Sequence, residues 1–254
     1  MDGADQLLVL VAGLVAGILA STVGVASLVS FPTLVALGLP PVTANVSNTL
    51  GLVPGGVTGA LGYRRELRAH PRLGWLILSC CVGGAAIGAT LLLALPSGVF
   101  EDVVPWLILL TCLLVGAQPT ISTWLARRGG VDATAEPRHH LSPVTTFFAT
   151  VTGVYGGYFG AGAGVMMVAV LGFGTDLDLK VITGLRTLSL MVGNVVAGLI
   201  FVVVADPAWD AVLLLATGSV FGGYVGARIG RRLPERVFRA LVVVAGILAA
   251  VMLF

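Results

Sequence analysis

The chain has 254 residues, of which 57% are hydrophobic and only 10% are charged, and its formal net charge is +2. Soluble domains carry about 25% charged residues, so this composition excludes an ordinary soluble protein and indicates an all-α integral membrane protein. A membrane-spanning helix needs about 20 apolar residues. Uncharged stretches of this order or longer cover residues 6–63, 73–100, 103–126, 141–175 and 211–227.

The N-terminus and the cysteines exclude other classes. Asp2 and Asp5 open the chain without a basic region, so the first apolar stretch is predicted to be part of the structure and not a secretory signal. Cys80, Cys81 and Cys112 lie within apolar stretches and form no CxxC or Cys/His spacing. We therefore predict no disulfide framework, no metal site and no cofactor.

The distribution of arginine predicts the topology. Apart from Arg186, the arginines fall in residues 64–72, 127–138 and 227–239. Short basic loops stay in the cytoplasm, so all three segments are predicted inside. The acidic loops at residues 96–102 and 206–210 contain no basic residue and are predicted outside. This topology places both termini outside a multi-pass protein of the cytoplasmic membrane.

Residues 141–173 conflict with this topology unless they enter and leave the membrane on the same side. If residues 141–173 and residues 181–205 each crossed the membrane once, the loop at 206–210 would lie inside and not outside. Two short helices of about 14 residues each would fit. The segment VYGGYFGAGAGVMMV, residues 154–168, predicts the break near residues 157–164, because glycine weakens a helix by about 1 kcal/mol relative to alanine.

Such a tip should line a site, since irregular backbone at membrane depth is tolerated only against protein or a water-filled cavity. The alternative is that these glycines serve close packing between helices.

The two halves of the chain also match each other. One constant shift overlays Gly13, Gly17 and Gly24 on Gly153, Gly157 and Gly164, and a similar shift overlays Gly84, Gly88 and Pro96 on Gly222, Gly226 and Pro234. The matched loops carry opposite charge, so the repeats are predicted to be inverted, each with a broken-helix hairpin and three transmembrane helices. The first hairpin is predicted to break in STVGVAS, residues 21–27, facing the second tip. Inverted repeats with broken helices are typical of transporters with a midplane site.

The predicted organisation is one compact membrane domain. It comprises a first repeat at residues 1–126, a cytoplasmic linker at 127–140 and a second repeat at 141–254.

Over nearly its whole length the sequence resembles the TauE/SafE family of sulfite-exporter-like membrane proteins. The matching segments are GLVAGILASTVGVASLVSFPTLVALGLPPVTANVSNTLGLVPGGVTGALGYRREL, GGYFGAGAGVMMVAVLGFG and GSVFGGYVGARIGRRLP. The resemblance implies export of a small sulfur-containing anion such as sulfite, sulfoacetate or a related organosulfonate. One departure is the TVGVAS segment, where the family commonly has a denser glycine motif.

Arg186 is the charged residue predicted to lie within an apolar span. An ionisable group at membrane depth predicts a function, and a guanidinium suits an oxyanion because it can form two parallel hydrogen bonds. The alternative is that the side chain snorkels to the nearby inner face.

The other predicted substrate-binding residues are neutral: Ser21, Asn45, Ser47, Asn48, Tyr158, Gly160, Gly162 and Thr187. Hydroxyls and amides can replace part of an anion's hydration shell, and glycines at a helix break expose backbone N–H groups. The alternatives are interhelical hydrogen bonds worth about 0.6 kcal/mol each, or packing for the tyrosine. Thr49, Ser189 and Asn194 are weaker candidates of the same kind.

The predicted spans contain no paired carboxylates, nucleophile–base pair or GxGxxG motif, so we predict no enzyme and no nucleic-acid partner. They contain no Asp or Glu for a proton relay. An anion leaving a negative interior gains about 2.3 kcal/mol per charge per 100 mV. We therefore predict a secondary exporter driven by membrane potential, with the lipid bilayer and a small anion as partners and a homodimer as a possible assembly. An anion channel and a membrane enzyme are the alternatives.

Overall fold

The helices follow the uncharged stretches of the sequence. The structure is a computed structural model that describes residues 2–22, 24–62, 71–128, 141–229, 240, 243–244 and 246–251. Its helices are α1 (Gly3–Thr22), α2 (Ser27–Ala36), α3 (Pro41–Gly62), α5 (Pro71–Ala94), α6 (Ser97–Arg128), α7 (Pro143–Tyr158), α8 (Ala163–Gly174), α9 (Leu179–Val204) and α10 (Trp209–Ile229). The described residues contain no β-strand, so the predicted all-α fold is confirmed. The predicted last span, residues 237–254, lies only partly among the described residues, of which 246–251 are helical.

Five of the described helices are long and apolar enough to cross a membrane: α1, α5, α6, α9 and α10. Large apolar side chains stand exposed along them, among them Trp75 on α5, Leu113 on α6 and Leu199 on α9. Exposed apolar patches of this extent are typical of a surface that faces lipid. The chain is therefore a multi-pass integral membrane protein.

Residues 141–174 form the predicted broken hairpin. Helix α7 has 16 residues and α8 has 12, and the chain between them turns at Gly160 and Gly162, whose φ angles are +83° and +79°. A Cβ on Gly174, at the end of α8, would collide with the Thr145 side chain at the start of α7. The two open ends of the hairpin therefore lie together, and the segment returns to the side from which it entered.

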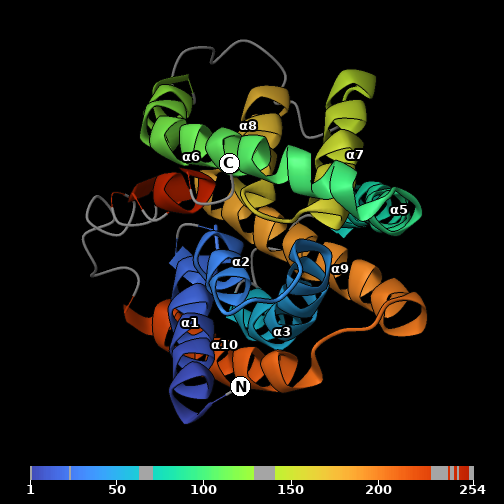
Figure 1. Ribbon diagram of the computed structural model, residues 1–254. Helices are drawn as coiled ribbons and strands as arrows, with labels where there is room; N and C mark the ends of the chain where they lie inside the picture. Colours follow the sequence, from blue (N-terminus) through green and yellow to red (C-terminus); the bar gives the residue numbers. More distant parts are fainter. Residues whose placement is uncertain are drawn as a thin grey trace.

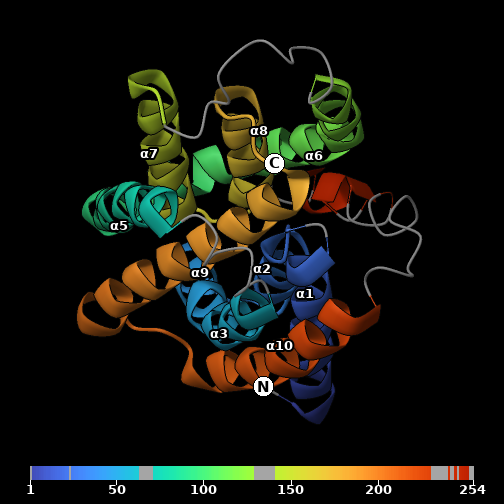
Figure 2. The same cartoon turned by 180° about the vertical axis from the view of Figure 1, so that it is seen from behind.

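The first hairpin breaks where the sequence predicts. Helix α1 ends at Thr22, α2 begins at Ser27, and Gly24 between them has a φ of +85°. The two arms of this hairpin differ in length, since α1 has 20 residues and α2 has 10. Most of α1 is therefore available to pack along α10, as Figures 1 and 2 show.

Each hairpin packs against a long helix of the other half of the chain through glycine. A Cβ on Gly13 of α1 would lie 2.6 Å from the Leu215 carbonyl oxygen of α10, and one on Gly84 of α5 would lie 2.5 Å from the Thr150 carbonyl oxygen of α7. Gly153 of α7, the repeat partner of Gly13, belongs to the second contact. Matched glycines thus make equivalent contacts. The inverted orientation of the repeats and the predicted domain limits stay predictions.

Two explanations were open for the glycines of the second hairpin, a helix break and close packing between helices, and each applies to some of them. Gly153 and Gly157 lie within α7, and a Cβ on either would press against the backbone of α5. Gly160 and Gly162 lie outside the helices and adopt positive φ. Close packing therefore explains the first pair and the helix break explains the second.

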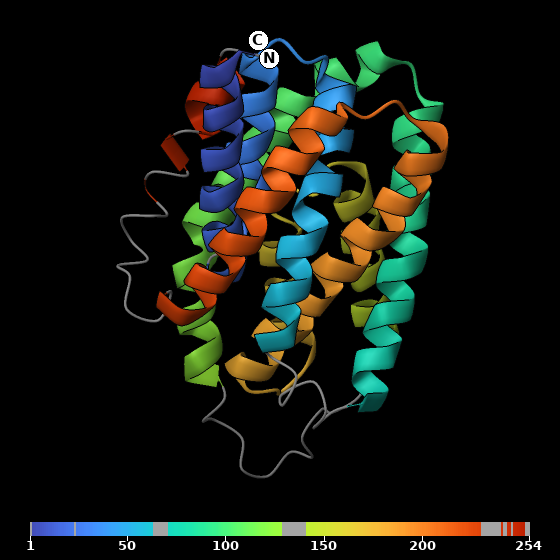
Figure 3. The same cartoon turned by 90° about the horizontal axis from the view of Figure 1, so that it is seen from below.

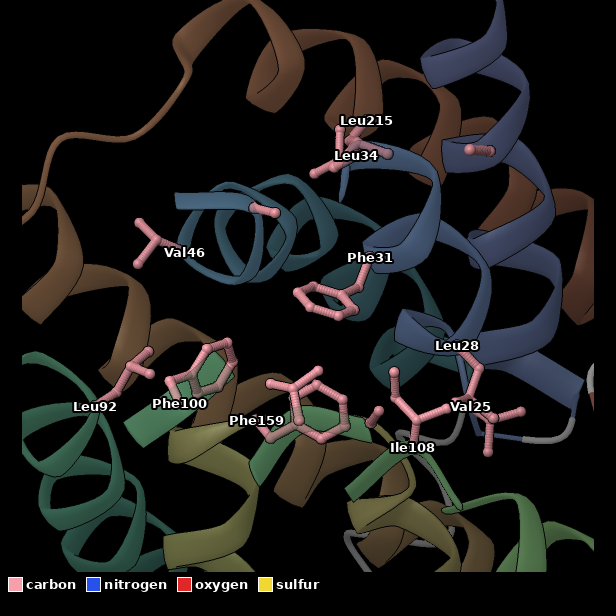
Figure 4. Close-up of a cluster of buried hydrophobic side chains, with 14 of the residues drawn as sticks. Val25, Leu28, Phe31, Leu34, Val46, Leu92, Phe100, Ile108, Phe159 and Leu215 are labelled. Atoms are coloured by element: carbon pink, nitrogen blue, oxygen red, sulfur yellow. The ribbon is translucent and has the colours of Figure 1, made fainter. Parts of the chain in front are cut away.

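A cluster of aromatic rings joins the two hairpins to α6 (Figure 4). The ring of Phe31 on α2 meets that of Phe159, just after α7, edge-on at 5.5 Å between centroids, and that of Phe100 on α6 at 6.4 Å. All three side chains are at most 1% exposed. Edge-to-face pairs add about 0.5–1.5 kcal/mol beyond the burial of their area. This cluster fixes α2 against the second tip.

Figure 3 shows the helices side by side in one bundle, running between its upper and lower ends. The connections α5–α6 and α9–α10 lie at one end of the bundle, and the start of α9 lies at the other. The two acidic loops therefore share a side, as the topology requires. The basic segments at 64–72, 127–138 and 227–239 fall largely outside the described residues, so which side faces the cytoplasm stays a prediction.

Two adjacent glycines of α5 test the packing role. A Cβ on Gly84 would meet backbone atoms of α7 at 2.5–2.9 Å, whereas one on Gly83 would meet nothing within 4 Å. We expect Gly84→Ala to lower stability by about 1–3 kcal/mol, because overpacking forces the helices apart. Gly83→Ala should leave stability unchanged or raise it, since alanine favours the helix. Thermal unfolding of the detergent-purified variants measures the difference, and equal melting temperatures would contradict the packing role.

Candidate substrate-binding site

The two hairpin tips meet inside the protein. A Cβ on Gly164, at the start of α8, would lie 2.9 Å from the Gly24 carbonyl oxygen in the first tip. The Ser27 Oγ lies 3.9 Å from the Cβ position of Gly160 in the second. Broken backbone at membrane depth requires a protein or aqueous environment, and each tip provides part of it for the other.

Side chains from neighbouring helices bind the backbone of the second tip. The Asn45 amide of α3 donates to the Tyr158 carbonyl oxygen at 2.9 Å. The Thr111 Oγ1 of α6 lies 3.0 Å from the Ala161 carbonyl oxygen and 2.8 Å from the Tyr155 hydroxyl. These contacts satisfy carbonyl groups that the interrupted helix leaves exposed.

At the first tip, the Ser21 Oγ lies 3.1 Å from the Gly17 carbonyl oxygen and 3.2 Å from that of Gly223 on α10. Its hydroxyl therefore donates to the backbone of its own helix or of the helix packed against it. The end of α1 is thereby held against α10.

Arg186 lies between the two tips. It stands about 10 Å along α9 from the start of that helix and is 2% exposed. Its Nη1 is 2.9 Å from the Cβ position of Gly24, and its Cδ is 3.4 Å from that of Gly164. A side chain at Gly24 would displace the guanidinium. The snorkelling alternative is wrong, because the side chain is directed into the protein.

A pocket opens beside this arginine. It contains about 540 Å³ of empty space, counting its open mouth. Its walls come from the ends of α1 and α2 at the first tip, from α3, from α9 and from Gly160 of the second tip. Three of the predicted residues line it: Ser21, Gly160 and Thr187. Asn194, a weaker candidate, does so as well.

The N-terminus of α2 forms one edge of this pocket. Ala26 and Ser27 line it, and no side chain caps the helix at Ala26. The first N–H groups of a helix lack partners within the helix and carry partial positive charge, which attracts anions. The N-terminus of α2 and the arginine behind Gly24 therefore both contribute positive charge that attracts an anion.

A second pocket lies across α9, with about 310 Å³ of empty space. It is lined from α5, α7 and α8, and the start of α8 contributes Ala163. Leu190 and Asn194 of α9 line both pockets. Each pocket thus adjoins the start of one returning half-helix, and α9 separates them, as its course between the two groups of helices in Figure 2 indicates.

The other neutral residues predicted to bind substrate do not line the first pocket. The Ser47 Oγ accepts from the Ala208 backbone N–H at 2.9 Å, and the Asn48 Oδ1 accepts from the Ser30 hydroxyl at 2.5 Å. Gly162 precedes α8, and its Cβ position faces the Thr111 side chain. For these residues, as for Asn45, substrate contact stays a prediction.

Tyr158 also lies away from the first pocket. Its ring packs edge-on against Phe100 at 5.6 Å between centroids, and its carbonyl oxygen is the one that accepts from Asn45. This is the packing role that the sequence left as an alternative. A direct contact of its phenol with substrate stays a prediction.

Sequence reasoning missed the contribution of α3 to the pocket. Gly55, Gly56 and Gly59 line it together with Leu52, and Met191 of α9 stands opposite. The signal was present in PGGVTG, residues 54–59, where three glycines fall within about one helical turn. Glycine at such density within a helix of a membrane protein indicates close approach or free space.

The comparisons with known proteins agree with this architecture. The sequence profile described as "Sulfite exporter TauE/SafE" matches residues 9–253. The chain belongs to the TauE/SafE family. The "Probable membrane transporter protein ORF9" of Sinorhizobium sp. is 27% identical over 252 residues, which cover 96% of this chain and 90% of the relative. The "Probable membrane transporter protein" of Haemophilus influenzae is 25% identical over 247 residues, covering 95% and 92%. No solved structure matches.

The resemblance noted in the sequence is therefore confirmed, and this TauE/SafE protein is a membrane transporter of helical, multi-pass architecture. The family match begins at residue 9, within α1, and includes the rest of the first hairpin, the second hairpin and α9. The names of the relatives state no substrate.

The hydroxyl of Thr111 offers a test of how the second tip is held. Thr111→Val removes the hydroxyl that contacts Tyr155 and Ala161, and we expect a loss of about 1–3 kcal/mol because buried polar groups lose their partner. Thr111→Ser should restore most of it. Thr217→Val is the matched control, since that exposed threonine donates only within its own helix, to Leu213. Thermal unfolding would count against the role of Thr111 if the two valine variants melted alike.

Proposed function

We propose that this protein exports a small sulfur-containing anion, such as sulfite, sulfoacetate or a related organosulfonate, across the cytoplasmic membrane. The observation that carries the proposal is the placement of Arg186, buried between the two hairpin tips and behind the wall of a pocket. The substrate class follows the family, and the position of the charge follows from the fold.

The electrostatics of the pocket favour an anion. The guanidinium lies behind the pocket wall beside Gly24, and the N-terminus of α2 lines the pocket at Ala26 and Ser27. No acidic residue is among those that line the pocket in the described part of the chain. A positive group in a low-dielectric site acts more strongly on an anion than it would in water. Asn194 adds an amide that can donate to an oxyanion.

The membrane potential supports export as the direction. The predicted spans hold no Asp or Glu that could carry protons, and the acidic residues of the long helices lie near helix ends, such as Asp5 of α1 and Asp210 of α10. A monoanion that moves out of a negative interior gains about 2.3 kcal/mol per 100 mV, enough for accumulation outside without a second ion. We also propose that both termini and the two acidic loops lie outside.

Two separate pockets support a carrier over a channel or an enzyme. Leu190 and Asn194 lie between the pockets, so the substrate would have to pass α9 through a change of conformation. The described residues contain no group of three or more His, Cys, Asp or Glu side chains placed to hold a metal. An arginine and a helix N-terminus are sufficient to bind an anion, and this binding involves no chemical reaction of the substrate.

Efflux from proteoliposomes tests the proposal. We expect vesicles loaded with sulfite to release it in a protein-dependent manner when the interior is made negative, with no proton gradient. Arg186→Gln should slow this efflux about tenfold or more, because the buried positive charge is lost, and Arg186→Lys should retain part of it.

The matched control is Arg228→Gln, which removes an exposed arginine whose guanidinium stacks on Tyr224 at 4.4 Å from the ring centroid. It should transport like the wild type. Efflux that requires a proton gradient at fixed potential would exclude the potential-driven mechanism. Equal rates for Arg186→Gln and Arg228→Gln would exclude the proposed site.

A further inference from the structure

Most glycines in the helix contacts of this protein are required by packing. A Cβ on Gly13, Gly84 or Gly157 would come within 3 Å of the backbone of a neighbouring helix. In α3, a Cβ on Gly51 would lie 2.6 Å from the Leu215 Cβ, and one on Gly55 would lie 2.8 Å from the Ser219 carbonyl oxygen. At these positions no larger residue fits without moving a helix.

Gly56 and Gly59 of α3 are different. A Cβ on Gly56 would meet Met191 of α9 at 3.5 Å, and one on Gly59 would meet the Thr187 Cγ2 at 3.5 Å and the Ser21 Oγ at 3.9 Å. These are ordinary van der Waals distances, so alanine would fit at both positions. Neither residue adopts a positive φ. Packing and backbone conformation therefore do not explain glycine at these two sites.

Both glycines line the first pocket, and both lack a side chain on the wall that faces α9. Because glycine weakens a helix relative to alanine, the sequence keeps a residue that destabilises α3 at positions where a methyl group would fit. What a methyl group would take away is space: beside Met191 for Gly56, and between Ser21 and Thr187 for Gly59.

We propose that Gly56 and Gly59 determine the size of the substrate. The inference rests on the proposed function, in that the pocket is taken as the substrate site. Gly59 keeps open the end of the pocket that lies between the Ser21 hydroxyl of the first hairpin and the Thr187 methyl group of α9. Gly56 keeps open the apolar wall formed with Met191, where the hydrocarbon part of an organosulfonate would lie.

Transport of a graded series tests this role. The series is sulfite, methanesulfonate, ethanesulfonate and propanesulfonate, each measured as efflux from proteoliposomes under an inside-negative potential. For Gly56→Ala we expect propanesulfonate efflux to fall about tenfold relative to sulfite, because one methylene too many against an apolar pocket wall changes discrimination by about 10- to 200-fold. For Gly59→Ala we expect the loss to begin at methanesulfonate. Sulfite is the smallest of the four anions, so Gly56→Ala should slow its efflux less than that of any organosulfonate, whereas the double variant should carry sulfite alone.

Stability separates this role from a structural one. Both variants should melt at or above the temperature of the wild type, since alanine favours the helix and meets no clash. Gly116→Ala is the matched control: it lies exposed on α6, and a Cβ there meets nothing within 4 Å. It should match Gly56→Ala in stability and the wild type in selectivity. Gly55→Ala, one residue away, should instead lose stability through its contact with Ser219.

The outcomes are distinct. Stable variants with a shortened substrate range support the inference. Stable variants that carry the whole series in the wild-type ratio overturn it while leaving the proposed function intact. Variants that lose all four substrates equally along with their melting temperature also overturn it, because the glycines would then be packing residues. A wild-type protein that carries none of the four anions overturns the proposed function, and this inference with it.

Discussion

The need to satisfy backbone groups at two helix breaks inside the membrane governs this structure. Hydrocarbon offers no hydrogen bonds, so a broken helix is stable only where protein or water supplies them. The tips of the two hairpins therefore lie against each other and not against lipid. Asn45 binds the Tyr158 carbonyl oxygen, Thr111 binds that of Ala161, and the Gly24 carbonyl oxygen lies beside Gly164. Arg186 occupies the interior that this meeting creates. The site is thus a consequence of how the breaks are accommodated.

Glycine meets this need in three ways that residue counts do not distinguish. At Gly24, Gly160 and Gly162 it permits positive φ, which L side chains rarely adopt. At positions such as Gly13 and Gly84 it lets two helix backbones approach, so that each hairpin adheres to a helix of the other half. At Gly56 and Gly59 it leaves space. These three roles are distinguished by the atoms that a Cβ at each glycine would touch. The sequence, with its 35 glycines, does not show those neighbours directly.

Much of the fold could be predicted because membranes restrict it so strongly. The uncharged stretches predicted the spans, and the parity of crossings predicted that residues 141–173 turn back, which the close approach of Gly174 to Thr145 confirms. The break in residues 21–27 followed from the internal repeat. The site was less accessible to prediction. Arg186, Ser21 and Thr187 could be chosen because polar groups are rare at this depth. The contribution of α3 to the pocket could not be predicted. A small rotation of this helix decides whether its glycines face α9 or α10, and glycine is compatible with either contact.

The distribution of close contacts also bears on how such a protein would move. Helices α1 and α3 are both held to α10 by backbone contacts at glycine, through Gly13 and Gly55, and α7 is held to α5 in the same manner. Contacts of this closeness resist sliding, since protein interiors do not deform continuously. Both pockets lie instead along α9, between these two groups, and Leu190 and Asn194 separate them. A rearrangement that opened one pocket and closed the other would therefore occur at α9. It would change the surroundings of Arg186, because one tip belongs to each group. The element that bears the charge is thus also the element at which the two groups of helices meet.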